Sequence, residues 1–157
     1  MAEITLGKAL KIKNRLAGRL AKVQVDIQAF NSIPESQTGQ VNVPALVQTR
    51  EELVGALVSL KTAINEANRE TQRDIYDLAE KKGTVQFLAG VNTRHGPLPA
   101  VYPSTTEIKY VAALKKADVD GMVAGLEKEI DQLQDRLDQF NHDRKIEVDG
   151  RILELAS

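Results

Sequence analysis

The chain contains no cysteine and no tryptophan, and only 4% of its 157 residues are aromatic. The lack of cysteine excludes a disulfide scaffold, a thiolate zinc site, an iron–sulfur cluster and a cysteine nucleophile. A core with so few rings must be built from aliphatic side chains, which favours packed helices over an aromatic-rich β-sandwich. The composition therefore predicts a mainly α fold and, at this length, a single helical domain over residues 1–157.

Long apolar runs and an excess of charge of one sign are also missing. The longest stretch without a charged side chain, residues 36–49, is rich in Ser, Gln and Thr, so no segment is predicted to span a membrane. The 21 basic and 22 acidic residues nearly cancel, which argues against a generic nucleic-acid binder. The first residues lack a basic stretch followed by an apolar block, so we expect no signal peptide and a cytoplasmic location.

Apolar residues at heptad spacing predict long antiparallel helices with coiled-coil-like seams in the first half of the chain. Residues 6–30 carry two such rows, one interrupted by Lys13, which either specifies register or extends its stem to the edge of the seam. A polar loop at 31–43 then leads into a second helix, with Pro44 in its first turn. The polar run 65–74 predicts a kink or short turn in that helix.

The second half begins with three–four spacing again, at Ile75, Leu78, Lys82, Val85, Ala89 and Asn92. Residues 93–105 hold three of the five prolines and predict a long loop. Residues 106–114 place Ile108, Tyr110, Ala112 and Leu114 at alternate positions, on one side of a short predicted strand.

The seam of the last helix, 118–140, is uninterrupted, and Asp118 is expected to cap its first turn. Asp149-Gly150 is a pair that favours a two-residue turn, and it lies between two short apolar stretches, 145–148 and 151–155. These segments predict a small C-terminal β-hairpin.

Charge is distributed unevenly between the first and last helices. Residues 1–30 have a net charge of +4, and residues 118–140 a net charge of −5. Opposite charges on two helices favour their adjacent packing, either within a subunit or between subunits. The alternative is that each charge set is a solvated face.

Several segments resemble the septicolysin-like family of small helical bacterial and phage proteins. The resemblance covers roughly residues 6–141, excludes the Pro-rich loop at 94–103 and the expected hairpin, and implies long antiparallel helices and an oligomer. The segments that carry it are Leu60-Lys-Thr-Ala-Ile-Asn-Glu-Ala-Asn68, Ile75-Tyr-Asp-Leu-Ala-Glu-Lys-Lys82, Thr106-Glu-Ile-Lys109 and Leu126-Glu-Lys-Glu-Ile-Asp-Gln-Leu-Gln-Asp135.

Catalytic and metal-binding patterns are missing from the sequence. The two histidines, His95 and His142, lie in no metal-ligand or catalytic motif, and His142 is interpreted as a polar helix end. Acidic residues along the last helix, such as Asp131, Asp135 and Asp138, are typical of a solvated face. With no phosphate loop, dinucleotide fingerprint or nucleophile elbow, the sequence predicts no enzyme, no metal and no cofactor.

Residues 93–110 concentrate the side chains that recognise small anions. Arginine and lysine offer positive charge, tyrosines offer flat faces for a base, and Ser and Thr offer hydroxyl donors. The alternative is that this loop packs back on the helices through its apolar residues. The candidate ligand-binding residues are Arg94, His95, Tyr102, Ser104, Thr105, Thr106, Lys109 and Tyr110.

These patterns leave three functions open. The first is a non-catalytic homo-oligomer that captures a nucleotide-like anion, which in a phage would act as a sponge for a host signal. The second is a structural or protein-interaction coiled-coil module. The third is a membrane-active toxin, against which the mixed charge and the lack of a large apolar face argue. Self-association is expected because complete heptad rows on a monomer would leave apolar stripes in water.

Overall fold

The computed structural model describes residues 1–98, 103 and 106–157, and it is mainly α, as predicted. The chain forms two compact units, residues 1–70 with 138–157 and residues 71–137. The predicted single domain stays a prediction, and each unit is described by itself. The helices are α1 (Leu6–Phe30), η1 (Glu35–Gln37), α2 (Val43–Ala67), η2 (Asn68–Thr71), α3 (Gln72–Ala89), α4 (Lys116–Asp143) and α5 (Gly150–Ala156). The strands are β1 (Ala2–Thr5), β2 (Gly96–Leu98), β3 (Ile108–Tyr110) and β4 (Lys145–Val148).

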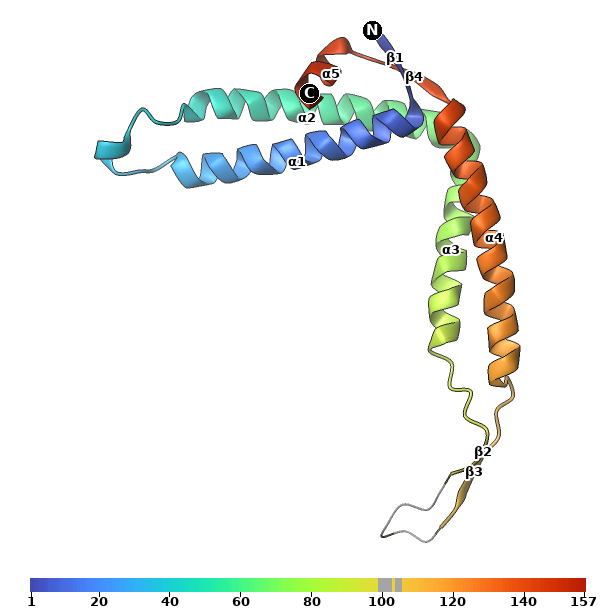
Figure 1. The fold of residues 1–157 in the computed structure, drawn as a ribbon. Coiled ribbons are helices and arrows are strands. Elements are labelled where there is room, and N and C mark those ends of the chain that lie inside the picture. Colours follow the sequence, from blue (N-terminus) through green and yellow to red (C-terminus); the bar gives the residue numbers. More distant parts are fainter. Residues whose placement is uncertain (99–102, 104–105) are drawn as a thin grey trace. The chain divides into compact units, whose positions relative to one another are not determined.

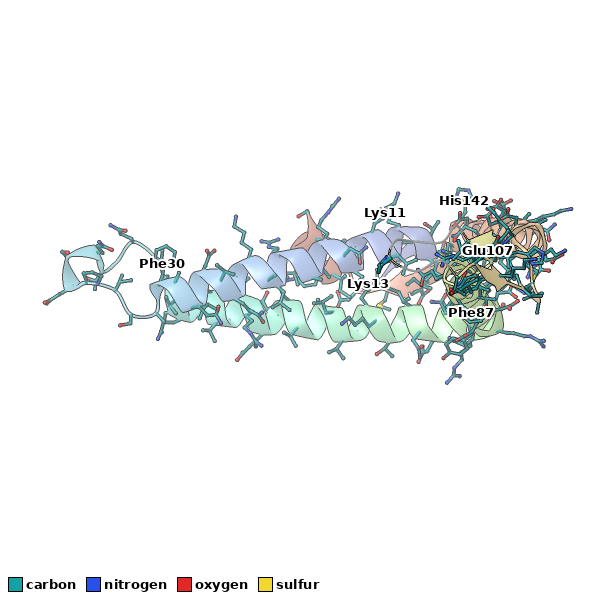
Figure 2. The ribbon with its side chains drawn as sticks, turned by 90° about the horizontal axis from the view of Figure 1, so that it is seen from below. Lys11, Lys13, Phe30, Phe87, Glu107 and His142 are labelled. Carbon is teal, nitrogen blue, oxygen red and sulfur yellow. The ribbon has the colours of Figure 1, made fainter. Side chains whose placement is uncertain are left out.

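In the first unit α1 and α2 lie side by side and run in opposite directions (Figure 1). The predicted heptad rows supply their interface, and Leu6, Leu16, Leu53 and Leu60 are fully buried. Lys13 is half-buried, on the side of α1 opposite to the exposed Lys11, which extends away from α2 (Figure 2). The aliphatic core predicted from the composition is therefore present in this hairpin.

Local signals set the start of both helices. The Thr5 hydroxyl accepts a hydrogen bond from the Lys8 N–H, and the Asn42 side chain accepts one from the Ala45 N–H. Each bond satisfies a backbone donor that has no partner within the helix. Pro44 lies in the first turn of α2, as expected, and the predicted break at 65–74 is the turn η2.

The C-terminus completes the first unit, and here the predicted β-hairpin is wrong. Strand β4 pairs antiparallel with β1, with Ile4 opposite Ile146, while residues after Asp149 form α5. The Asp149 carboxylate accepts from the Arg151 N–H and caps this helix. Ile152 and Leu155 become buried against α1 and α2, and this burial, which local sequence cannot show, favours the helix over a hairpin.

Two arginines of α1 hold the end of α5. Arg15 donates to the Ala156 carbonyl at 3.1 Å, and Arg19 donates to the Leu155 carbonyl at 2.6 Å. The last carbonyls of a helix lack partners and carry partial negative charge, so a guanidinium stabilises them. Arg15 and Arg19, two of the basic residues of α1, therefore have a structural role.

In the second unit α3 and α4 lie side by side (Figure 1). Two ion pairs join them, Lys81 to Glu129 at 2.6 Å and Arg136 to Asp74 at 3.1 Å. Among the described residues of this unit, four apolar side chains are buried: Leu88, Val119, Leu133 and Leu137. The α3–α4 pair thus buries less apolar surface than the α1–α2 pair.

The predicted seam of α3 is corrected in its last turns. Leu88 is buried where Ala89 was expected, and Lys81 is half-buried while Lys82 is exposed. Lys81 therefore takes the seam position expected for Lys82 and pairs there with Glu129, and Leu88 takes the position expected for Ala89, while Val85 is half-buried as expected. Gly83 lies within α3 and does not end it.

Residues 93–105 were expected to form a long loop, but part of this segment is the strand β2. Strand β2 pairs with β3 in a two-stranded ribbon, in which Pro97 lies opposite Lys109. A proline without an N–H is tolerated here because both strands are edges. The predicted strand at 106–114 is shorter, and Asp118 lies inside the first turn of α4, where its carboxylate accepts from the Lys115 N–H.

Within the first unit α1 packs against α2 and α5, and the Leu6 N–H donates to the Arg144 carbonyl. Pairing of the oppositely charged first and last helices, within a subunit or between subunits, stays a prediction. Within the described part of the chain, no helix is long and apolar enough to cross a membrane.

Candidate functional site

The ribbon β2–β3 places three of the predicted ligand-binding residues together. The Arg94 guanidinium lies over the ring of Tyr110, 5.4 Å from its centroid, which is cation–π geometry. His95 lies beside them, where its Nδ1 accepts a hydrogen bond from the Ala112 N–H at 3.2 Å. Arg94 and His95 are exposed, and Tyr110 is half-buried.

The hydrogen bond of His95 determines which of its nitrogens is able to meet a ligand. Because Nδ1 accepts from the backbone, the proton of the neutral ring is on Nε2. The ring is thereby held against the strand and offers one N–H donor at its outer edge. A phosphate or carboxylate oxygen is a suitable acceptor for that donor.

Gly96 provides a left-handed backbone conformation at the start of β2. Its φ is +98°, a region that residues with a side chain rarely adopt. Gly96 is the first residue of β2 and lies opposite Tyr110, so the left-handed conformation comes directly after His95. The sequence shows a glycine here, but the need for a positive φ follows only from the fold.

Lys109 does not join this group within one chain. Successive side chains of a strand point to opposite faces, so Lys109 lies on the face of β3 opposite to Tyr110 and the Arg94 that covers it. Thr106 is exposed and precedes β3. Tyr102, Ser104 and Thr105 lie outside the described residues.

A surface cleft in the first unit brings together basic side chains from segments far apart in the sequence. The cleft has a volume of about 580 Å³. Its lining residues come from the start of α1, with the capping residue Thr5, and from the last turns of α4: Thr5, Gly7, Lys8, Lys11, Asp138, Asn141 and His142. His142 lies in the last turn of α4, as the interpretation of a polar helix end implies. Asp138 adds a carboxylate, so the cleft has mixed charge.

Metal binding has no support in the described ranges, where no three His, Asp or Glu residues converge on one point. The carboxylates of Asp131 and Asp135 are exposed and four residues apart along one helix. Such a row presents its charges to solvent and not to a shared centre.

The chain matches no protein-family model, and no curated protein or solved structure matches it either. The resemblance to the septicolysin-like family therefore stays a hypothesis that rests on the sequence segments alone.

Proposed function

We propose that this protein is a non-catalytic binding protein that self-associates and captures a small anionic, nucleotide-like ligand at the ribbon β2–β3. The observation that carries this proposal is the exposed Arg94 guanidinium held over Tyr110 beside His95. Stacking on the ring orients the planar fork before a ligand arrives, which lowers the entropic cost of binding. Cytoplasmic location and a phage sponge role belong to the same proposal.

Self-association follows from the arrangement of the charges on the ribbon. The Arg94 guanidinium lies on the Tyr110 side of the ribbon and Lys109 on the other, so a single chain does not surround an anion with both cations. A second copy is able to bring its Lys109 face against the Arg94 face of the first. The oligomer implied by the septicolysin-like resemblance is in line with this reading.

Isothermal titration calorimetry against linear and cyclic nucleotides tests the proposal. We expect binding by the wild type and at least a tenfold loss of affinity in Arg94→Ala, because a charged hydrogen bond contributes about 1.5–3 kcal/mol. Arg73→Ala, an exposed arginine of α3, is the matched control and should bind as the wild type does. Absence of heat with every nucleotide at millimolar concentration would refute capture of this ligand class.

A protein-interaction module is the second candidate, and exposed apolar side chains in the second unit favour it. Phe87 is 69% exposed, Tyr76 is 63% exposed and Met122 is 47% exposed. Large apolar side chains on an otherwise charged hairpin are typical of a surface that contacts another protein. In this case Arg94→Ala with Lys109→Ala weakens capture of a protein partner in a pull-down, while no nucleotide changes the melting temperature.

A further inference from the structure

The basic residues of α1 form one stripe along the helix, which we call the basic stripe. Lys8, Lys11, Arg15, Arg19 and Lys22 lie within an arc of about 80° when successive residues are spaced by 100°. All five are exposed, and the apolar face of α1 is turned instead toward α2. Within the described residues, Lys8, Lys11 and Lys22 have no ion-pair partner.

The acidic residues of α4 form a matching stripe, which we call the acidic stripe. Asp120, Glu127, Asp131, Asp135 and Asp138 also lie within an arc of about 80°, and all are exposed. Asp120 pairs with Lys116, whereas Glu127, Asp131 and Asp135 have no ion-pair partner in the described part of the chain. The fold thus leaves three carboxylates of one helix face and three ammonium groups of another without a counter-charge.

The spacing of the two stripes is the same. Three, four and four residues separate Lys8, Lys11, Arg15 and Arg19, and the same intervals separate Asp138, Asp135, Asp131 and Glu127 when α4 is followed in the opposite direction. An antiparallel helix pair therefore aligns four opposite charges in one register. A parallel pair that begins at Lys11 and Glu127 aligns four as well.

Both faces are also open to the approach of another helix. Gly18 lies next to the basic stripe, and Gly121 lies near the acidic stripe. A Cβ atom placed on either glycine would meet nothing within 4 Å. A neighbouring backbone is able to come close at these positions, where no side chain intervenes.

We propose that the basic stripe of one copy packs along the acidic stripe of a second copy of this chain. In a two-fold symmetric dimer the contact forms twice, because each copy supplies one stripe of each sign. Opposite charges aligned along two helices define the register and speed the encounter, and they are screened by salt. This inference rests on the proposed self-association and adds a helix contact that holds the two copies together when their ribbons meet.

Two charge-reversed variants test the interface. The acidic variant is K8E/K11E/K22E, and the basic variant is E127K/D135K/D138K. Arg15 and Arg19 are kept because they hold α5, and Asp131 is kept because it faces Arg15 in either register. We expect each variant alone to have the monomer mass of 17.3 kDa by light scattering, with helical circular dichroism unchanged. Mixing the two pairs opposite charges at three of the four aligned positions in either register, so the mixture should return to the wild-type mass at 50 mM NaCl and lose it at 500 mM.

A matched control reverses three exposed lysines outside the basic stripe, K61E/K82E/K115E, and should keep the wild-type mass. Two results would overturn the inference and leave self-association intact. In the first, each variant measured by itself keeps the wild-type mass; in the second, the mixture of the two variants stays monomeric. A monomeric wild type at micromolar concentration would instead overturn the proposed self-association itself. Pairing K11E with D135K or with E127K then tells the antiparallel register from the parallel one.

Discussion

Asp149 and Gly150 illustrate how one dipeptide supports two local structures. In a hairpin both residues would adopt positive φ, whereas here the only described residues with positive φ are Gly39 and Gly96. Asp149 caps α5, and Gly150 occupies its first position. The choice between turn and cap is made by Ile152 and Leu155, whose burial against α1 and α2 requires helical spacing.

Substitution of Gly150 by alanine distinguishes a hairpin turn from a helix start at this position. We expect Gly150→Ala to raise the free energy of unfolding by about 0.4–1 kcal/mol, because alanine restricts the unfolded chain and suits a helix. A Cβ at this position meets nothing within 4 Å. Urea denaturation followed by circular dichroism measures the change.

Substitutions of Asp149 test the start of α5 independently, through its capping side chain. Asp149→Ala should lower the free energy of unfolding by about 0.5–2 kcal/mol, since it removes the cap of α5, while Asp149→Asn retains an acceptor and should lose little. If Gly150→Ala destabilises the protein instead, the residue needs a left-handed conformation and the assignment of α5 is incorrect.

The two helix pairs differ at the level of elements. The α1–α2 pair is held by complete apolar rows, with Leu16 and Leu60 fully buried. The α3–α4 pair has a half-buried lysine on its seam, and Lys81 meets both Glu129 and Asp77. An ion pair at such a position contributes to register more than to stability.

The pH dependence of stability tests the Lys81 contact. The hydrogen bond to Glu129, with the charge of Asp77, raises the pKa of Lys81 above its ordinary value. A pKa that is higher in the folded state than in the unfolded state stabilises the fold fully below the unfolded value of about 10.4, and this contribution is lost as the pH rises through the folded value. We therefore expect the urea midpoint of the wild type to fall above pH 10.5.

Lys81→Arg provides the comparison because arginine stays charged over this range. The difference in urea midpoint between this variant and the wild type should grow in favour of the variant from pH 9 to pH 11.5. Lys145, whose pKa is raised by its hydrogen bond to Glu3, is present in both proteins, and its effect cancels. A difference that is constant with pH would show that the Lys81 contact does not form in solution.

Across the whole molecule, burial is divided unequally between the two units. The first unit contains a continuous cluster that joins α1, α2, β1, β4 and α5. The described part of the second unit has four buried apolar residues and leaves Phe87 and Met122 exposed. Local opening of a helix pair is easier where fewer apolar contacts oppose it.

Hydrogen exchange measures this difference directly. In dilute protein we expect the amides of Thr71–Leu137 to exchange at least tenfold faster than those of α1 and α2, which corresponds to about 1.4 kcal/mol. Exchange from α4 should slow as the protein concentration rises, because self-association covers its exposed face. Equal protection of the two units at low concentration would contradict the division of the core.

The candidate site was predictable in part. Residues 93–110 could be singled out because Arg94, His95 and Tyr110 belong to types that bind anions, and these three do lie together. The sequence could not show that Lys109 is on the other face, because that depends on the pairing of β2 with β3. Nor could it show that Arg15 and Arg19 each donate a hydrogen bond to the end of α5.

Heptad spacing by itself determined that this chain is mainly α, where α1 and α2 lie and which of their faces are apolar, because helical periodicity is a local property. Strand β4 and helix α5 were decided only by tertiary structure. Their register and conformation depend on β1 and on the apolar faces of α1 and α2, which are at least 78 residues away (145 − 67) in the sequence of 157. Contacts between segments so far apart leave no periodic signal in the segments themselves.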